Sequence, residues 1–218
     1  MLIAVMDDNE LPPTSSRVVD WRSKGYVSDI KDQGDCGACW AFAIAGTLES
    51  LYYEKHKQTR DFSEQQLVDC TGAYFNYGCN GGWLENTYYF VTLHGIAQES
   101  EYPYIEGESG SCKQLEGDFK ISAYRSVPGD CQSVLAALQS SPLAVAVEAY
   151  YWQFYSSGVF SNCGYWLDHA VVLVGADLNN GHWTVKNSFG KDWGEDGYIR
   201  LAMGNTCGLC FYSTYPLL

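Results

Sequence analysis

A cysteine that could act as a nucleophile stands near the start of a predicted helix. Cys39 ends the run Cys36-Gly-Ala-Cys39 and opens the apolar segment that follows it. In the first turn of a helix, the unpaired N–H groups and the helix dipole favour the thiolate form of a cysteine. The thiolate is the nucleophilic form, so this position predicts a reactive sulfur.

The base that such a nucleophile needs must come from elsewhere, and His169 is the candidate. It begins an apolar run that ends at Gly175 and has the length of a strand. A neutral histidine at a strand end is more often an ordinary surface residue, so His169 carries little weight by itself. Asn187 follows on a neighbouring predicted strand, and Cys, His and Asn are the three parts of a Cys-His-Asn catalytic arrangement. The set therefore predicts nucleophilic catalysis by Cys39.

The first half of the chain is predicted to be helical. Apolar residues recur at helical spacing over 39–53, with no Pro, so a long and mostly buried helix is expected there. Ser63-Glu-Gln-Gln66 has the spacing of a capping box and predicts a short second helix. A third helix is expected over 82–94.

After about residue 120 the pattern changes to short apolar runs separated by Gly, Asn and Asp, which is typical of strands. The expected strands are 142–148, 169–176, 182–187 and 198–202, and a helix over 131–140 interrupts them. Helices first and strands second predict an α+β protein in two halves. A cleft between the halves is the natural ligand site.

Motifs along nearly the whole chain resemble the papain and cathepsin L family of cysteine proteases. The run Cys36-Gly-Ala-Cys-Trp40 fits the signature around the nucleophile of papain-type enzymes, with His169 and Asn187 well downstream. The other matching runs are Val19–Arg22, Glu64–Cys70, Gly78–Gly82, Tyr102–Tyr104, Asp168–Ala170, Lys186–Ser188, Trp193–Arg200 and Tyr215–Pro216. The resemblance implies a cysteine endopeptidase with a papain-like two-domain fold.

The resemblance also implies how the chain divides. Residues 24–122 would form a helical left subdomain, and residues 123–218 a right subdomain like an antiparallel β-barrel, with the active-site cleft between them. An N-terminal arm over 11–23 would join the right subdomain, and together these parts make one peptidase unit. Residues 1–10 are expected to be the remnant of a removed pro-segment, or residues that precede the natural sequence.

Carried over by position, the resemblance assigns four catalytic residues. Cys39 becomes the nucleophile, His169 its partner and Asn187 the residue that holds the imidazole ring. Gln33 becomes the oxyanion donor, together with the backbone N–H of Cys39. The imidazolium then protonates the leaving amine, and water hydrolyses the thioester. No cofactor and no metal is implied.

An extended peptide substrate is implied as well. It would hydrogen-bond to the backbone of Gly82 and the carbonyl of Asp168, since a glycine lets another chain approach closely. Gly37, Gly81 and Trp193 are also assigned to substrate binding. The walls of the subsite for the P2 side chain would be Trp83, Leu84, Ala146, Leu167, Ala170 and Tyr212.

Three positions depart from what is common in the family. Tyr212 stands where many relatives carry a smaller or an acidic residue, which predicts a shallow pocket that prefers Val, Leu or Pro to Phe and rejects Arg. Phe189 stands where the family usually carries a Trp that covers the Asn–His hydrogen bond, so a wetter contact and a modest activity deficit are expected. Ala38, where Ser is commoner, has no direct chemical role.

The cysteine count is nine, an odd number, so at least one thiol lies outside any intramolecular bridge. The bridges that the resemblance implies are Cys36–Cys79, Cys70–Cys112 and Cys163–Cys207. Cys131 and Cys210 then remain, either as a fourth disulfide or as two free buried thiols.

Two other interpretations of the cysteines are weaker. Cys36 and Cys39 could be a redox pair, but no βαβ context accompanies them. With Cys207 and Cys210 they could form a zinc site. Zinc ribbons, however, keep their two pairs about 15 to 20 residues apart, whereas these pairs lie at opposite ends of the chain.

The overall composition limits the partners and the compartment. The chain has 218 residues, 13 basic and 26 acidic, and a formal net charge of −13, which argues against nucleic acid or an anionic membrane as partner. No apolar run approaches the roughly 20 residues of a membrane helix. The nine cysteines and the acidic composition predict that the protein is located in a lysosome or a digestive vacuole, or is secreted, although an acidic surface also simply confers solubility.

The expected partners are peptide or protein substrates, the protein's own pro-segment and cystatin-like inhibitors, and a monomer is expected. No His-His insertion lies between Gly82 and Tyr102, where carboxydipeptidase relatives block the cleft, so endopeptidase activity is expected. The alternative is a non-catalytic or mineral-templating relative such as the silicateins, which replace the nucleophilic Cys with Ser, whereas this chain retains Cys39. Transpeptidation through the same acyl-enzyme is the alternative within the enzyme class.

Overall fold

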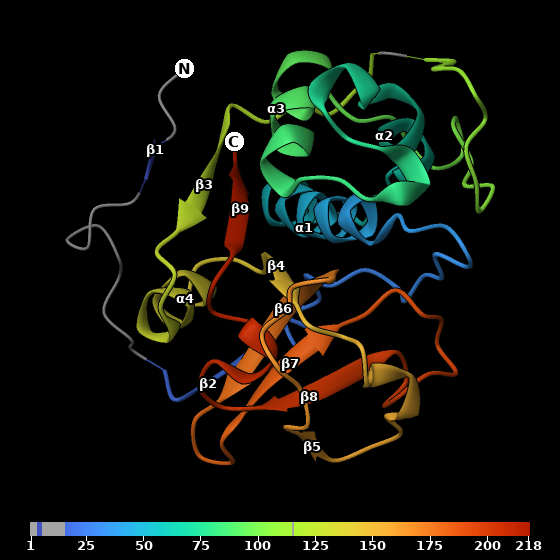
Figure 1. The fold of residues 1–218 in the computed structure, drawn as a ribbon. Coiled ribbons are helices and arrows are strands. Elements are labelled where there is room, and N and C mark those ends of the chain that lie inside the picture. The colour runs from blue at the N-terminus through green and yellow to red at the C-terminus, as the bar shows by residue number, and fades with distance from the viewer. Residues whose placement is uncertain (1–3, 6–15, 115) are drawn as a thin grey trace.

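The protein's structure is a computed structural model that describes residues 4–5, 16–114 and 116–218. Three α-helices occupy one half of the molecule, and a large mixed sheet with a fourth helix extends through the other (Figure 1). This arrangement confirms the predicted α+β class. The expectation for residues 1–10 lies outside the described residues, apart from strand β1 (Ala4–Val5).

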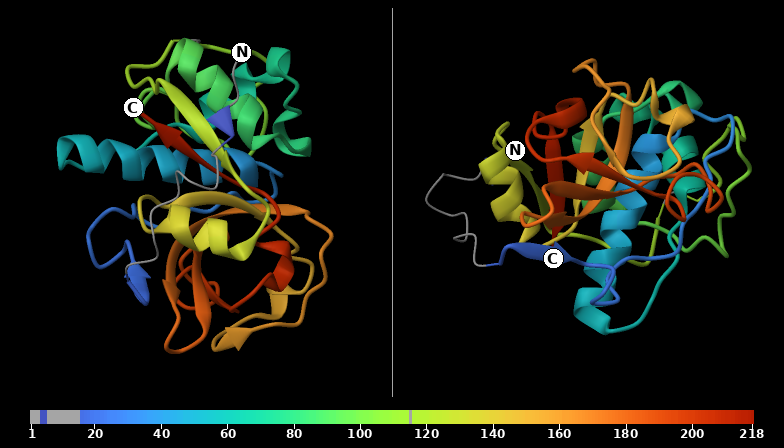
Figure 2. Two further views of the ribbon diagram at one scale, coloured as in Figure 1. Left: turned by 90° about the vertical axis from the view of Figure 1, so that its left-hand side faces the viewer. Right: turned by 90° about the horizontal axis from the view of Figure 1, so that it is seen from below.

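Helix α1 (Cys39–His56) is the central element and lies between the other two helices of its half and most of the sheet (Figures 1 and 2). It is buried continuously from Trp40 to Tyr52, which explains why its apolar residues do not form a single stripe. Lys57 ends the helix in the left-handed conformation, and its N–H bonds to the Tyr53 carbonyl.

The shorter helices begin where side chains cap them or where the chain straightens. The Ser63 hydroxyl accepts the Gln66 N–H and caps α2, as predicted. The predicted third helix begins two residues late, because Trp83 is extended and its N–H bonds to the Asn76 side chain. The bounds are α2 (Glu64–Cys70), α3 (Leu84–His94), α4 (Cys131–Leu138) and the 3-10 turns η1 (Gly72–Tyr74), η2 (Gly78–Asn80), η3 (Trp152–Phe154) and η4 (Thr206–Gly208).

The sheet places strands from distant parts of the chain side by side. Its order is β1-β3-β9-β4-β6-β7-β8-β5, with β2 paired to β6. Neighbours are antiparallel except for β1 with β3 and β5 with β8. The strands are β2 (Val18–Asp20), β3 (Ala123–Val127), β4 (Leu143–Val147), β5 (Val159–Phe160), β6 (His169–Asp177), β7 (His182–Lys186), β8 (Tyr198–Ala202) and β9 (Ser213–Leu217). Each of the four predicted strands lies within one residue of its expected ends.

Two hydrophobic cores are present. One packs α1 against α2 and α3 and reaches Ala170 near the start of β6. The other packs α4 against the sheet and includes Leu173 and Trp183. We propose that these cores belong to the predicted subdomains, 24–122 and 123–218. The described part of the predicted arm 11–23 pairs with β6 through β2, which supports placing the arm with the second subdomain.

Disulfides fix the loops of both halves. Cys39 is the one free cysteine, and all nine cysteines lie in the described part of the chain. The fourth bridge joins Cys131 to Cys210, so the alternative of two free thiols is wrong. The remaining bridges are those that the resemblance implies: Cys36–Cys79, Cys70–Cys112 and Cys163–Cys207.

Candidate active site

Cys39 is held at the start of α1 by a tight loop. The Cys36–Cys79 disulfide closes this loop, and the Gly37 N–H bonds to the Cys79 carbonyl at 3.0 Å. A Cβ on Gly37 would lie 2.3 Å from that carbonyl oxygen, so only glycine fits. No side chain caps α1, and the backbone N–H of Trp40 bonds to the Cys39 sulfur. The helix N-terminus therefore supplies positive potential to the sulfur.

The sheet brings His169 and Asn187 together. β6 and β7 are antiparallel neighbours with Val172 opposite Lys186, so the start of β6 lies beside the residue that follows β7. His169 Nε2 donates to Asn187 Oδ1 across 2.7 Å, because the amide oxygen can only accept. The two residues are 9 % and 3 % exposed. The other ring nitrogen is left for the hydrogen bond with Cys39.

Cys39 and His169 stabilise each other's charged form. Burial raises the pKa of Cys39, but the hydrogen bond and charge of His169 outweigh burial and hold this pKa below its ordinary value. Burial lowers the pKa of His169, but the hydrogen bond and charge of Cys39, with help from Asn187, raise it above its ordinary value. The geometry thus favours a thiolate and an imidazolium side by side.

Gln33 lies beside Cys39, and both the nitrogen and the oxygen of its side-chain amide are hydrogen-bonded. Its Nε2 donates to the Cys36 carbonyl at 3.0 Å, and its Oε1 accepts the Ser188 hydroxyl at 2.7 Å. The backbone N–H of Gln33 also bonds to the Ser188 carbonyl, at 2.9 Å. Because its oxygen is bound by Ser188, the amide presents its N–H side toward the loop before Cys39. Sequence reasoning missed Ser188, whose partner lies 155 residues away.

Two hollows meet at Cys39 and His169, and together they form one groove. The first, of ≈ 400 Å³, extends past Gln33 and Gly37 to Tyr150. The second, of ≈ 530 Å³, extends to Tyr212. They share Cys39, Asn80, Gly81, Asp168 and His169.

The second hollow contains all six residues predicted to form the P2 pocket, together with Gly82. A Cβ on Gly82 would lie 2.5 Å from the Trp40 ring, so packing on α1 also requires glycine here. Trp193 lines neither hollow. Sequence reasoning did not assign Tyr77, Asn80, Ala149 or Tyr150 to the groove, which they also line.

Aromatic rings cover His169 more completely than Phe189 alone suggests. Phe189 stacks on the imidazole with ring centroids 4.8 Å apart. Trp152 meets the imidazole at an angle of 85° and 5.9 Å, and Trp193 lies behind Phe189 at 5.4 Å. Both His169 and Asn187 are buried, and the wetter contact expected from Phe189 stays a prediction.

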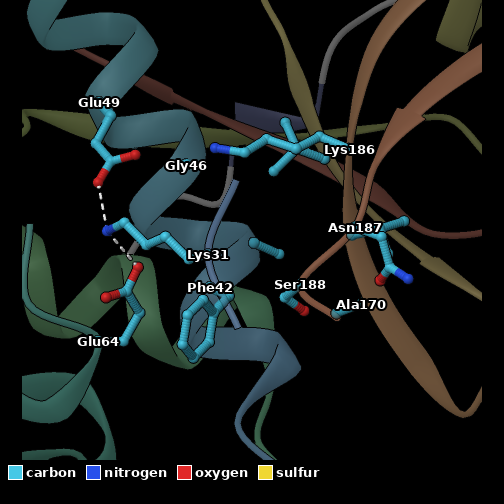
Figure 3. Close-up of a pocket in the computed structure, with 12 residues that line it drawn as sticks. Lys31, Phe42, Gly46, Glu49, Glu64, Ala170, Lys186, Asn187 and Ser188 are labelled. Carbon is cyan, nitrogen blue, oxygen red and sulfur yellow. Dashed lines mark hydrogen bonds and ion pairs between the residues drawn. The ribbon is translucent and has the colours of Figure 1, made fainter. Parts of the chain in front are cut away.

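A buried cluster of charges lies behind the site, between α1 and the sheet (Figure 3). The Lys31 ammonium contacts the buried carboxylates of Glu49 at 2.9 Å and Glu64 at 2.7 Å, and the exposed carboxylate of Asp61 at 2.6 Å. Lys186, which precedes Asn187, donates to the Ser28 hydroxyl at 2.7 Å. The cluster surrounds a cavity of ≈ 20 Å³, enough for about one water.

The pKa values of two acids in this cluster are shifted in opposite directions. Burial raises the pKa of Glu64 to about 8, because the Lys31 ammonium is shared with Glu49 and Asp61 and cannot compensate three carboxylates. Burial also acts on Glu49, but Lys31 and Lys186 hold its pKa below the ordinary value. Sequence reasoning missed this cluster, which Glu49, the one charged residue in the buried stretch of α1, could have indicated.

Within the described residues, no group of three or more His, Cys, Asp or Glu side chains is arranged to hold a metal ion. No helix in the same part of the chain has the length and apolar character to cross a membrane.

Comparisons with known proteins agree with this geometry. The profile of a family described as papain family cysteine protease matches residues 15–217. Cathepsin L 2 of Paramecium tetraurelia is 42 % identical over 207 residues, which cover 92 % of this chain and 64 % of that protein. The chain thus spans less than two thirds of the length of this relative.

Solved structures share the fold. Digestive procathepsin L 3 from the larval midgut of Tenebrio molitor superposes with a TM-score of 0.90 at 37 % identity, over 99 % of this chain and 74 % of that chain. The bromelain protease of Ananas comosus, in complex with the E64 inhibitor, has a TM-score of 0.86 at 40 % identity, over 93 % of this chain and 99 % of that chain.

Proposed function

The chain belongs to the papain family of cysteine proteases, and on that basis we propose that it is an endopeptidase that cuts extended polypeptides with Cys39. One observation carries the proposal. A free cysteine, hydrogen-bonded to a histidine that Asn187 orients, lies where two hollows meet. A peptide that occupies both hollows would place its scissile carbonyl over the sulfur of Cys39.

The proposed reaction has two halves. The Cys39 thiolate attacks the carbonyl carbon, and the negative oxygen that forms is stabilised by the Gln33 amide and the backbone N–H of Cys39. The tetrahedral intermediate collapses, the C–N bond breaks, and the His169 imidazolium gives its proton to the leaving amine. Neutral His169 then takes a proton from water as that water attacks the thioester. The carboxylic acid product leaves and Cys39 is restored.

The second hollow is proposed to bind the P2 side chain, which is the second residue before the scissile bond. Apolar side chains dominate its walls, and Tyr212 is one of them. We expect Val, Leu or Pro to bind better than Phe. Arg is expected to be rejected, because none of the six P2 wall residues carries a carboxylate and Asp168, which also lines the hollow, already accepts the Ala149 N–H.

The proposed partners and compartment follow the family. The Tenebrio relative was solved as a procathepsin, which supports a pro-segment as a partner of this chain, and we propose cystatin-like inhibitors as a second. Four disulfides and the net charge of −13 support a lysosome, a digestive vacuole or secretion. We propose that the protein acts as a monomer, because the groove is formed within one chain.

Mapping of cut sites in a reduced, unfolded protein substrate tests this function. Internal cuts with Val, Leu or Pro at P2 are expected, Cys39→Ala should abolish them, and Tyr212→Ala should add sites with Phe at P2. Removal of residues only from the chain ends would show an exopeptidase instead. Equal use of Val and Phe by the unaltered chain would refute the P2 assignment alone.

A further inference from the structure

Trp152 is a buried aromatic residue beside His169 that the proposed reaction does not use. It lies in η3 and is 0 % exposed. Its ring centroid is 5.9 Å from that of His169, with an interplanar angle of 85°. It also stacks on Trp193 at 6.1 Å, and its carbonyl accepts the Trp193 Nε1–H at 3.1 Å. Its position against the imidazole is therefore fixed from both sides.

Phe189 is the second aromatic residue that contacts the His169 ring. It stacks on the imidazole at 4.8 Å and 29°, and packs edge-on against Trp193 at 5.4 Å. Trp193 thus supports both rings that touch His169. We call Trp152, Phe189 and Trp193 the aromatic enclosure.

We propose that Trp152 is a positioning residue for His169, and that it provides the cover which a Trp at position 189 usually provides in this family. Water that entered beside the ring would compete with His169 for Asn187 Oδ1 and weaken their 2.7 Å hydrogen bond. Phe189 alone is smaller than an indole, yet His169 and Asn187 are both buried. The contact with Trp152 accounts for the difference.

The hydrogen-bonding state of Trp152 supports this role. Its Nε1 is buried and has no hydrogen-bond partner within the described residues. An unpaired buried donor costs free energy, and a phenyl ring at this position would avoid that cost. The indole is therefore explained by the area that it covers and not by a polar contact.

The role predicts a change in pH dependence. The titratable groups that act on His169 are Cys39 from α1 and Asp168, the residue directly before it. The hydrogen bond with Asn187 favours the imidazolium. A weaker bond lets His169 lose its proton at a lower pH. For any reaction that needs the imidazolium, the fall in rate at alkaline pH (the alkaline limb of the pH–rate profile) should then occur at a lower pH.

The test compares Trp152→Phe with Trp183→Phe. Trp183 is an equally buried indole, 1 % exposed, whose Nε1 donates to the Gly204 carbonyl at 3.0 Å away from the proposed site. Alkylation of Cys39 by iodoacetate, whose carboxylate is attracted to the imidazolium, is measured against pH. Trp152→Phe should lower the alkaline limb by about 0.3 to 1 pH unit and kcat about two- to tenfold, with KM unchanged. Trp183→Phe should reduce thermal stability and leave the limb in place.

Rescue distinguishes this role from a structural one. Phe189→Trp should raise kcat in the Trp152→Phe background and give no gain in the unaltered chain. An unchanged limb in Trp152→Phe, or the same gain from Phe189→Trp in both backgrounds, would overturn the proposal. The proposal rests on the proposed function for the role of His169, but iodoacetate reports on Cys39 without any peptide. Absence of peptide hydrolysis would thus refute the proposed function, while the pH dependence of Cys39 alkylation could still be measured.

Discussion

At the scale of single residues, the site depends on which donors are fixed before the substrate arrives. Gln33 is 8 % exposed, and three hydrogen bonds to Cys36 and Ser188 hold it. A donor held in advance needs no reorganisation when charge develops on the substrate oxygen, so it contributes more to the transition state than to binding.

Gln33→Ala should therefore lower kcat by about 10²- to 10³-fold and change KM little. Steady-state kinetics on a fluorogenic peptide measure this effect, and Gln132→Ala, on the exposed surface of α4, is the control. A raised KM with an unchanged kcat would assign Gln33 to substrate binding and not to the oxyanion.

At the scale of elements, the start of α1 is positioned by the loop before it. Gly37→Ala would press a methyl group against the Cys79 carbonyl, 2.3 Å away, and shift the first turn of the helix. Misplacement of a catalytic group by about 1 Å can lower the rate about 10²-fold, so Gly37→Ala is expected to lose activity by tenfold or more. Gly72→Ala is the matched control, because nothing lies within 4 Å of its added Cβ. Equal activity of the two variants would refute the argument.

The elements with regular local patterns were predictable from the sequence. Helix α1 is a long, mostly apolar segment without Pro, and strands β4, β6, β7 and β8 are short apolar runs bounded by turn residues. The family motifs placed Cys39, His169 and Asn187. Strands such as β3 and β9 lack a strong pattern, and they form because each pairs with the other although they lie far apart in the sequence.

The parts of the site that sequence reasoning missed depend on distant partners. Ser188 matters because it binds Gln33, and Trp152 because the fold sets it against His169. The late start of α3 likewise depends on the Asn76 side chain. No local pattern encodes such contacts.

At the scale of the whole molecule, the buried charge cluster couples stability to pH. The folded pKa of Glu64 is raised to about 8 from 4.5. Between these values the folded protein keeps a proton that the unfolded chain has released. Its contribution to stability is therefore complete below about pH 4.5 and is lost as the pH rises toward 8.

Glu64→Gln should remove this contribution to the pH dependence. The neutral amide imitates the protonated acid, and its oxygen can still accept a hydrogen bond from Lys31. Relative to the unaltered chain, the variant should be similarly stable at pH 4.5 and increasingly more stable toward pH 8, by at most about 1.4 kcal/mol per pH unit. Denaturant unfolding at several pH values measures this difference. A difference that does not change with pH would show that Glu64 is ionised throughout.

The central claim, that Cys39 is the nucleophile of a working protease, has one direct test. The protein is titrated with E64, the inhibitor in the bromelain complex, while peptide hydrolysis is followed and the modified residue is located by mass spectrometry. One equivalent should modify Cys39 and abolish hydrolysis in proportion. A folded protein that neither turns over peptide nor reacts at Cys39 under reducing conditions would contradict the account.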